Sequence, residues 1–341
     1  MKLFKPLLIA TATIALAGCT SSDVVDDILR TDANRIGFNT SVSKGSRALT
    51  NTNFNRFFVF GSYTLPTQSQ AITVFSHQLV SKNDAGSWTY EGDQYWNPDG
   101  TYDFYAYSCE NSDMNPSVGT WGLNGRILNL NEVEANASHQ HDLLFAKVTN
   151  QRRAENSTTA APVAFKFNHI LSRVKFTFAT NFPAGYKTTV SNVRLENFRD
   201  MGTFLGSSLT WNAVKRSSDN ISMNLKLPAT VADISSTSVS TEAAYFIPFT
   251  YEHADVRLVF DIDVTKDGNK MIGRTITATW QPDWHAGHSI NNAITINVGT
   301  TGVAKISFTA TIGGDEGADA DGWSSDTGAL NGLHFDAGAS N

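Results

Sequence analysis

The stretch that decides the fold is VRLVFDIDVTK, residues 256–266. Every second residue from Val256 to Val264 is apolar, and the residues between them are mostly charged. This period of two predicts a β-strand with one face in a core and the other in water. Residues 266–269, KDGN, follow as a hairpin turn, and residues 272–280 run back as the second strand of the hairpin.

Similar apolar alternation recurs along most of the chain, with turn residues between the segments and almost no helical period. Further strands are expected at residues 35–42, 57–63, 102–107, 127–130, 163–167, 174–178, 190–198, 221–227, 244–249, 294–298 and 306–312. The segment HDLLFA, residues 141–146, fits either a strand or a helical turn. Many short strands joined by turns predict an all-β protein with two antiparallel β-sandwich domains in tandem.

The composition is typical of a β-rich extracellular protein. Hydrophobic residues make up 41% of the chain and charged residues only 17%, and the net charge is -6. Because no basic block is present, nucleic acid is not an expected partner. If Cys19 carries lipid, Cys109 has no partner, so no intrachain disulfide is expected and stability must come from packing.

The first 19 residues, MKLFKPLLIATATIALAGC, indicate a secretory signal. The apolar run is too short to span a bilayer, which takes about 20 residues. The final LAGC matches the lipobox of bacterial lipoproteins, in which the cysteine thiol carries a diacylglycerol. We therefore expect a signal peptide over residues 1–19 that ends in a lipidated Cys19 on the outer membrane. The alternative is an ordinary signal with an incidental cysteine.

The rest of the chain is divided by composition. Residues 20–34 are expected to form a tether, whose acidic residues either resemble the surface-export signal of Bacteroidetes lipoproteins or are simply solvated. Residues 150–162 lack apolar periodicity, so we place a domain boundary there. The expected domains are residues 35–158 and 159–312, followed by a flexible, Gly- and Asp-rich extension at 313–341.

Candidate reactive side chains do not form a recognisable site. His139 and His141 make an H-x-H pair, but no third ligand lies at tight spacing, and Asp142 would point the other way on a strand. His285 and His288 lie in a polar turn. The acidic run at 315–322 lacks the alternating ligands and the terminal Glu of a calcium loop.

No nucleophile elbow, phosphate-binding loop or dinucleotide fingerprint is present in the sequence. We therefore expect no enzyme, no cofactor and no metal, although a carboxylate pair for glycoside hydrolysis stays open. Trp88, Trp96 and Trp121 could stack on sugars, or they could belong to a β-core.

Several segments, in this order, resemble the fimbrillin family of Bacteroidetes, the type V pilins. They are WNPDG at 96–100 leading into YDFYAY at 102–107, HDLLFA at 141–146, FKFNHILSRVKFTF at 165–178 and WHAG at 284–287. The likeness covers roughly residues 35–312. It implies transthyretin-like topology for both sandwiches, export as a lipoprotein, and removal of the first strand by a trypsin-like protease on the cell surface.

In that family a neighbouring subunit donates a strand into the emptied groove, which restores the backbone hydrogen bonds and the apolar core. The strand expected to leave is 35–42, with an inward face made of Ile36, Phe38, Thr40 and Val42. The expected cleavage site is the bond between Arg47 and Ala48, because that segment is turn-like. Lys44 and Arg35 are the alternative sites.

The expected function is a structural subunit of a cell-surface fimbria with a role in adhesion. Its expected partners are other fimbrial subunits, the surface protease, and a host or bacterial surface receptor. The tail, residues 313–341, is only weakly apolar and suits a donor strand poorly. A tip or anchor subunit, or a surface lipoprotein that binds glycans, therefore stays an alternative.

Overall fold

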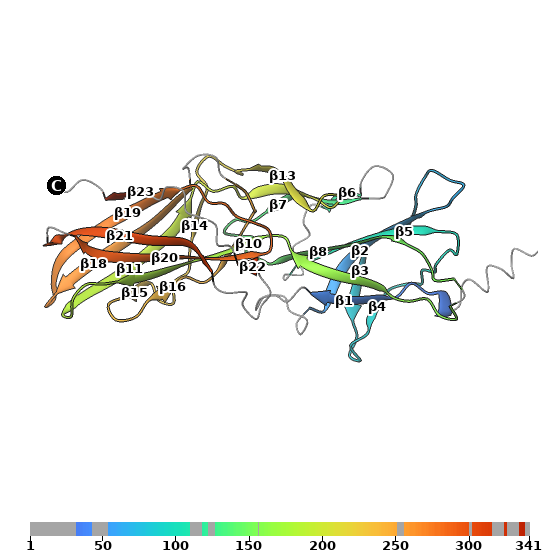
Figure 1. Ribbon diagram of the computed structural model, residues 1–341, viewed down its shortest axis with the longest axis horizontal. Coiled ribbons are helices and arrows are strands. Elements are labelled where there is room, and N and C mark those ends of the chain that lie inside the picture. The colour runs from blue at the N-terminus through green and yellow to red at the C-terminus, as the bar shows by residue number, and fades with distance from the viewer. Residues whose placement is uncertain are drawn as a thin grey trace, which may run out of the picture.

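The computed structural model describes residues 32–42, 54–109, 118–121, 127–155, 157–250, 256–299, 302–315, 324–325 and 334–337, which form an elongated set of β-sheets (Figure 1). Within these residues the one helical segment is η1, a 3-10 turn at Asp32–Asn34. None of the described helices is long and apolar enough to cross a membrane. The predicted all-β class with antiparallel sheets is confirmed.

A seven-stranded sheet occupies one end of the molecule (Figure 1). Its strands are β1 (Phe38–Val42), β2 (Arg56–Thr64), β3 (Ile72–Lys82), β4 (Trp88–Tyr90), β5 (Thr101–Cys109), β8 (Leu143–Gln151) and β9 (Val163–His169). They lie in the order β1-β9-β8-β5-β2-β3-β4, and only the β1–β9 pair is parallel. The chain before β1 meets the chain after β4 through an isolated bridge between Arg35 and Tyr95, so the sheet curls toward its own edge.

A four-stranded sheet covers one face of the seven-stranded sheet. Its strands, in the order β13-β12-β7-β6, are β6 (Val118–Trp121), β7 (Leu128–Glu134), β12 (Met201–Leu205) and β13 (Thr210–Lys215). Apolar side chains of the two sheets share one core, in which the rings of Phe145 and Phe204 meet edge to face at 4.9 Å. The curled inner face of the seven-stranded sheet holds a second core, rich in phenylalanine.

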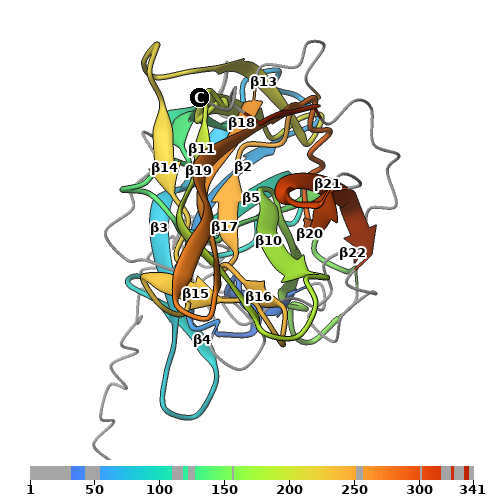
Figure 2. The same ribbon diagram turned by 90° about the vertical axis from the view of Figure 1, so that its left-hand side faces the viewer.

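Two six-stranded sheets pack face to face at the other end, as two layers that Figure 2 shows from that end of the molecule. One contains β10 (Ser172–Thr180), β16 (Val239–Ser240), β17 (Ala244–Phe246), β20 (His288–Gly299), β21 (Gly302–Asp315) and β22 (Ser324–Ser325). The other contains β11 (Tyr186–Glu196), β14 (Ser222–Asn224), β15 (Val231–Asp233), β18 (Val256–Lys266), β19 (Asn269–Trp280) and β23 (His334–Ala337).

The hairpin predicted for residues 256–280 is present as β18 and β19. Its five alternating apolar residues are all buried in the core between the two six-stranded sheets. The two-residue turn consists of Asp267 and Gly268, both with positive φ, which suits the right-handed twist of the flanking strands. HDLLFA, which the sequence left ambiguous, becomes strand from Leu143 onward.

Strand pairing crosses the boundary expected after residue 158. β9 follows that point but pairs with β1 and β8, and β12 follows it but pairs with β7. The division into two domains stays a prediction, and so does the flexibility of the extension at 313–341. Two short strands lie within that extension: β22 pairs with β20, and β23 pairs with β19.

Candidate functional site: the groove that holds β1

β1 is an edge strand whose ladder involves a single neighbour. Its five residue pairs with β9 run parallel, from Phe38 with Val163 to Val42 with Phe167. Among the described strands, none pairs with the other edge of β1. A short edge strand with one ladder therefore has fewer backbone hydrogen bonds to its sheet than a central strand, which pairs on both sides.

The inward side chains of this segment are nonetheless part of the core. Ile36 is 0% exposed, Phe38 7% and Val42 4%, whereas Thr40 is half-buried and Asn39 and Ser41 face outward. Burying three such side chains stabilises the folded chain by several kcal/mol in total, at about 2 kcal/mol each. The groove under β1 would therefore be an open apolar trough without β1.

Phe38 is the centre of an aromatic cluster on the inner face of the sheet. Its ring lies 5.8 Å from Phe57, 5.5 Å from Phe75, 5.7 Å from Tyr90, 6.4 Å from Phe104 and 5.8 Å from Phe165. Only Phe165 stacks nearly parallel to it, while the other rings meet it tilted or edge-on. Five aromatic rings therefore surround this position and favour an aromatic side chain there.

The chain just before β1 is held by polar contacts that the sequence did not indicate. The Arg35 guanidinium pairs with Asp93 at 2.8 Å, donates to the carbonyl of Gly92 at 3.1 Å and lies 4.9 Å above the Tyr90 ring. The amide of Ile36 donates to the carbonyl of Gln94 at 2.8 Å. These contacts tie residues 34–36 to the segment between β4 and β5.

The Tyr90 hydroxyl adds a further tie, because it donates to the carbonyl of Ile36 at 2.8 Å. Burial raises the pKa of Tyr90 above its ordinary value, although a backbone contact with Gln94 and the nearby Arg35 act in the opposite direction. The hydroxyl is therefore a proton donor throughout the neutral pH range.

A family model described as fimbrillin-like matches residues 46–314 of this chain. The chain belongs to the fimbrillin-like family. Because the matched residues make up most of the sequence, the resemblance seen in the segments from WNPDG to WHAG is confirmed. β1 precedes the matched region.

Solved structures similar to this fimbrillin-like chain come from Bacteroides species and from Porphyromonas gingivalis. They include a cell adhesion protein from Bacteroides ovatus, with 15% identity, a TM-score of 0.47 and coverage of 82% of this chain and 97% of that one. A cell adhesion protein from Bacteroides uniformis has 16% identity, a TM-score of 0.44 and coverage of 82% and 98%. The fimbrial anchor protein Mfa2 from Porphyromonas gingivalis has 10% identity, a TM-score of 0.38 and coverage of 82% and 98%. No curated protein sequence matches the chain.

The histidines considered as metal ligands lie in separate parts of this fimbrillin-like fold, apart from His285 and His288, whose ring centroids are 5.4 Å apart. His139 contacts Glu134 at 3.1 Å and His285 contacts Asp283 at 3.1 Å, while His169 contacts Asp142 at 2.9 Å. No group of three metal-ligating side chains forms within the described ranges. Asp142, expected from the sequence to point away from the His139 and His141 pair, contacts His169 instead, 27 positions along the chain.

The tryptophans considered for sugar stacking are core residues where the structure describes them. Trp96 is buried and meets Tyr102 at 4.6 Å, and Trp88 packs on Phe54 and Phe57. The side chain of Trp121 lies outside the described part of the structure. Cys19, Arg47 and Ala48 also lie outside the described residues, so lipidation and cleavage there stay predictions.

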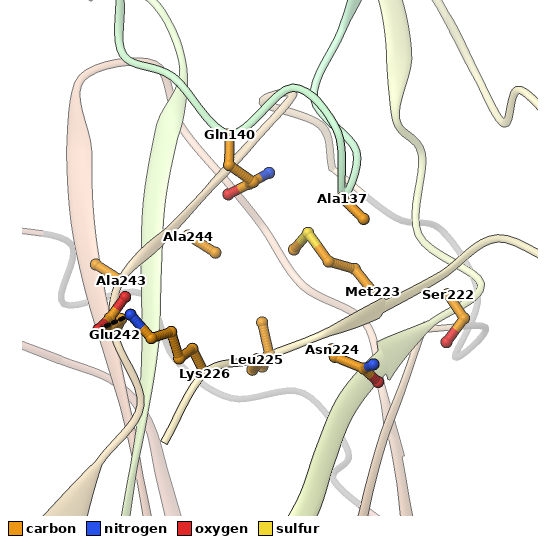
Figure 3. A pocket seen from close by; sticks show the side chains of 10 residues that line it. All are labelled: Ala137, Gln140, Ser222, Met223, Asn224, Leu225, Lys226, Glu242, Ala243 and Ala244. Carbon is orange, nitrogen blue, oxygen red and sulfur yellow. Dashed lines mark ion pairs between the residues drawn. The ribbon is translucent and has the colours of Figure 1, made fainter. Parts of the chain in front are cut away.

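A hollow of about 540 Å³ lies between β14 and the segment leading into β17, under the loop between β7 and β8 (Figure 3). Lys226 and Glu242 pair at 2.7 Å on its rim. The Gln140 amide donates to the Tyr245 carbonyl at 2.9 Å and accepts from the Tyr245 amide at 2.7 Å. Among the described residues that line this hollow, Glu242 is the one acidic side chain, so they supply no facing carboxylate pair of the kind that glycoside hydrolysis requires.

Proposed function

We propose that this chain is a structural, non-enzymatic subunit of a cell-surface fimbria that assembles by donor-strand exchange. In this proposal Cys19 is lipidated during export to the outer membrane. A trypsin-like surface protease then cuts after Arg47, and the segment carrying β1 leaves. An extended segment from a neighbouring subunit takes its place against β9, and the assembled fibre contacts a host or bacterial receptor.

The observation that carries the proposal is the combination of deep burial and sparse pairing in β1. Ile36, just before β1, and Phe38 and Val42 within it lie in the core, yet β1 itself pairs with one strand over only five residues. Loss of this strand would expose an apolar trough and the unpaired edge of β9. A replacement strand would restore both, as in strand addition generally.

The buried positions of β1 define what a replacement must look like. They require apolar residues at the positions of Ile36 and Phe38, with an aromatic ring at the second. Near the C-terminus, LHFDAGA at residues 333–339 has the same spacing, with Leu333 and Phe335 at these two positions. The structure describes residues 334–337 as β23, an edge strand paired with β19 by four residues. Although the tail as a whole is only weakly apolar, this segment carries large apolar residues at both required positions, and we propose it as the donor.

Trypsin treatment of the purified chain tests the proposal. The cut chain should lose residues 1–47 and form oligomers, measured by light scattering. Phe335→Ala should abolish oligomer growth, whereas Asp336→Ala, at the alternate position of the same segment, should leave it near the native rate. A cut chain that stays monomeric while retaining its N-terminal fragment would contradict exchange.

The alternative roles of tip or anchor subunit predict a different distribution on cells. A stalk subunit sheared from cells should begin at Ala48 and be recovered along the whole fibre. An anchor subunit should keep the acylated Cys19 and stay with the membrane fraction. N-terminal sequencing of both fractions separates these outcomes.

A further inference from the structure

Asp142 and His169 form a buried pair that has no part in the proposed strand exchange as described above. The side chains are 0% and 1% exposed, and His169 Nδ1 donates to the Asp142 carboxylate at 2.9 Å. Asp142 directly precedes β8, and His169 is the last residue of β9. The pair therefore connects the start of one strand with the end of its neighbour.

This connection matters because β9 has few other strand contacts. Its ladder with β8 consists of two residue pairs, Leu144 with His169 and Phe145 with Asn168. Residues 163–167 pair with β1 instead. When β1 leaves, these five residues lose that ladder, and β9 is held by its inward phenylalanines and by the short ladder at its C-terminal end.

We infer that Asp142 and His169 are positioning residues that hold β9 as an acceptor edge while the β1 position is empty. The inference rests on the proposed strand exchange. The two residues would not touch the donor strand. They act through β9, whose end they keep in register beside β8.

The surroundings of the pair support a role in register. The amide of Ile170 donates to the carbonyl of Leu143 at 3.0 Å, and the amide of Gly287 donates to the carbonyl of Leu171 at 2.8 Å. A Cβ at Gly287 would lie 3.1 Å from the carbonyl oxygen of His169, so this loop packs closely on the end of β9. A slip of β9 by one residue would break the Asp142–His169 bond and leave a buried carboxylate unpaired, which is strongly disfavoured.

Peptide capture tests the inference on the cut chain. A labelled peptide of residues 33–42 is titrated into trypsin-cut protein freed of its N-terminal fragment, and binding is followed by fluorescence anisotropy. Asp142→Asn and His169→Gln should each weaken binding by about tenfold. Asp200→Asn is the matched control, because Asp200 is also buried and bonded to Ser217 at 2.6 Å but lies outside the seven-stranded sheet. Its binding should stay within about twofold of the native value.

Amide hydrogen exchange of residues 163–167 in the uncut chain gives an independent readout. With β1 in place, Asp142→Asn should change these rates little. In a Phe38→Ala background, which loosens β1, the same substitution should speed exchange by about tenfold. A merely structural pair would produce the same increase in both backgrounds, and that result, or native peptide capture by both pair variants, would overturn the inference. If native cut protein captures no peptide, the proposed exchange fails, while the hydrogen-exchange comparison still decides whether the pair positions β9.

Discussion

The rings of Phe38 and Phe165 stack at a centroid distance of 5.8 Å with an interplanar angle of 17°. They come from β1 and β9, the one parallel pair in the seven-stranded sheet. Because the pairing is parallel, a strand that replaces β1 must enter in the same direction to place its aromatic ring over Phe165. The stacking therefore makes two demands on a strand that replaces β1: it must run parallel to β9, and it must carry an aromatic side chain at the position of Phe38.

Replacing Phe38 should therefore be costly. Phe38→Ala is expected to lower the free energy of unfolding by about 3 kcal/mol, because it removes a buried ring with five aromatic neighbours. Urea denaturation measures the loss. The exposed neighbour provides the control, since Asn39→Ala should stay within about 0.5 kcal/mol of the native value. Equal losses for the two variants would show that β1 does not contribute its inward face to the core.

Protease access should differ between the basic residues that flank β1. Arg35 is engaged by Asp93, Gly92 and Tyr90, and its backbone is bridged to Tyr95. Brief trypsin treatment of the folded chain should therefore spare Arg35 and yield a new N-terminus at Ala48, identified by mass spectrometry. Arg47→Ala should remove this product. A first cut at Arg35 would mean that its contacts do not protect the backbone.

Gly206 follows β12 and packs against the seven-stranded sheet. A Cβ there would overlap the carbonyl oxygen of Leu128 and lie 2.8 Å from the Phe145 ring. Gly206→Ala should cost about 3 kcal/mol of stability, because a backbone carbonyl in β7 cannot move aside as a flexible side chain can. Thermal denaturation checks this loss. Gly37→Ala serves as the comparison, because its Cβ would meet only Pro162 at 3.7 Å and should be tolerated.

His77 should make the stability of the seven-stranded sheet depend on pH. It stacks on Phe58 at 4.2 Å, and its Nε2 lies 2.8 Å from the Tyr107 hydroxyl. Burial lowers the pKa of His77 below its ordinary value of 6.5. Below that pH the unfolded chain binds more protons at this site than the folded chain. This contribution to stability is therefore complete above pH 6.5 and is lost as the pH falls toward the folded pKa.

Denaturation midpoints between pH 7.5 and pH 5 measure this dependence. His77→Gln should flatten the part of the curve that arises from His77, because glutamine does not titrate in this range. Burial raises the pKa of the neighbouring Tyr107, which therefore stays protonated across the scan. An unchanged slope in the variant would assign the dependence to other groups.

Local alternation along the chain is sufficient to predict the all-β class and the hairpin at β18 and β19. The alternation of apolar and polar residues indicates which side chains face inward. The turn residues Asp267 and Gly268 mark where the chain reverses direction. The same reasoning identified the inward face of residues 35–42. Each of these properties depends on neighbours within a few residues, which is why they can be read without tertiary information.

The sequence does not predict which strands pair with one another. Nothing in residues 35–42 indicates that β1 lies parallel to β9 or that Arg35 is held between Asp93 and Tyr90. In the same way, the segments around Asp142 and His169 do not indicate that these two residues, 27 positions apart, are in contact. Nor does composition reveal that pairing crosses residue 158. These contacts join segments far apart in sequence, and the choice among possible strand neighbours is made by packing of the whole core. Side-chain alternation predicts which face of a strand is buried, whereas the neighbouring strand is determined only by the packing of the assembled sheets.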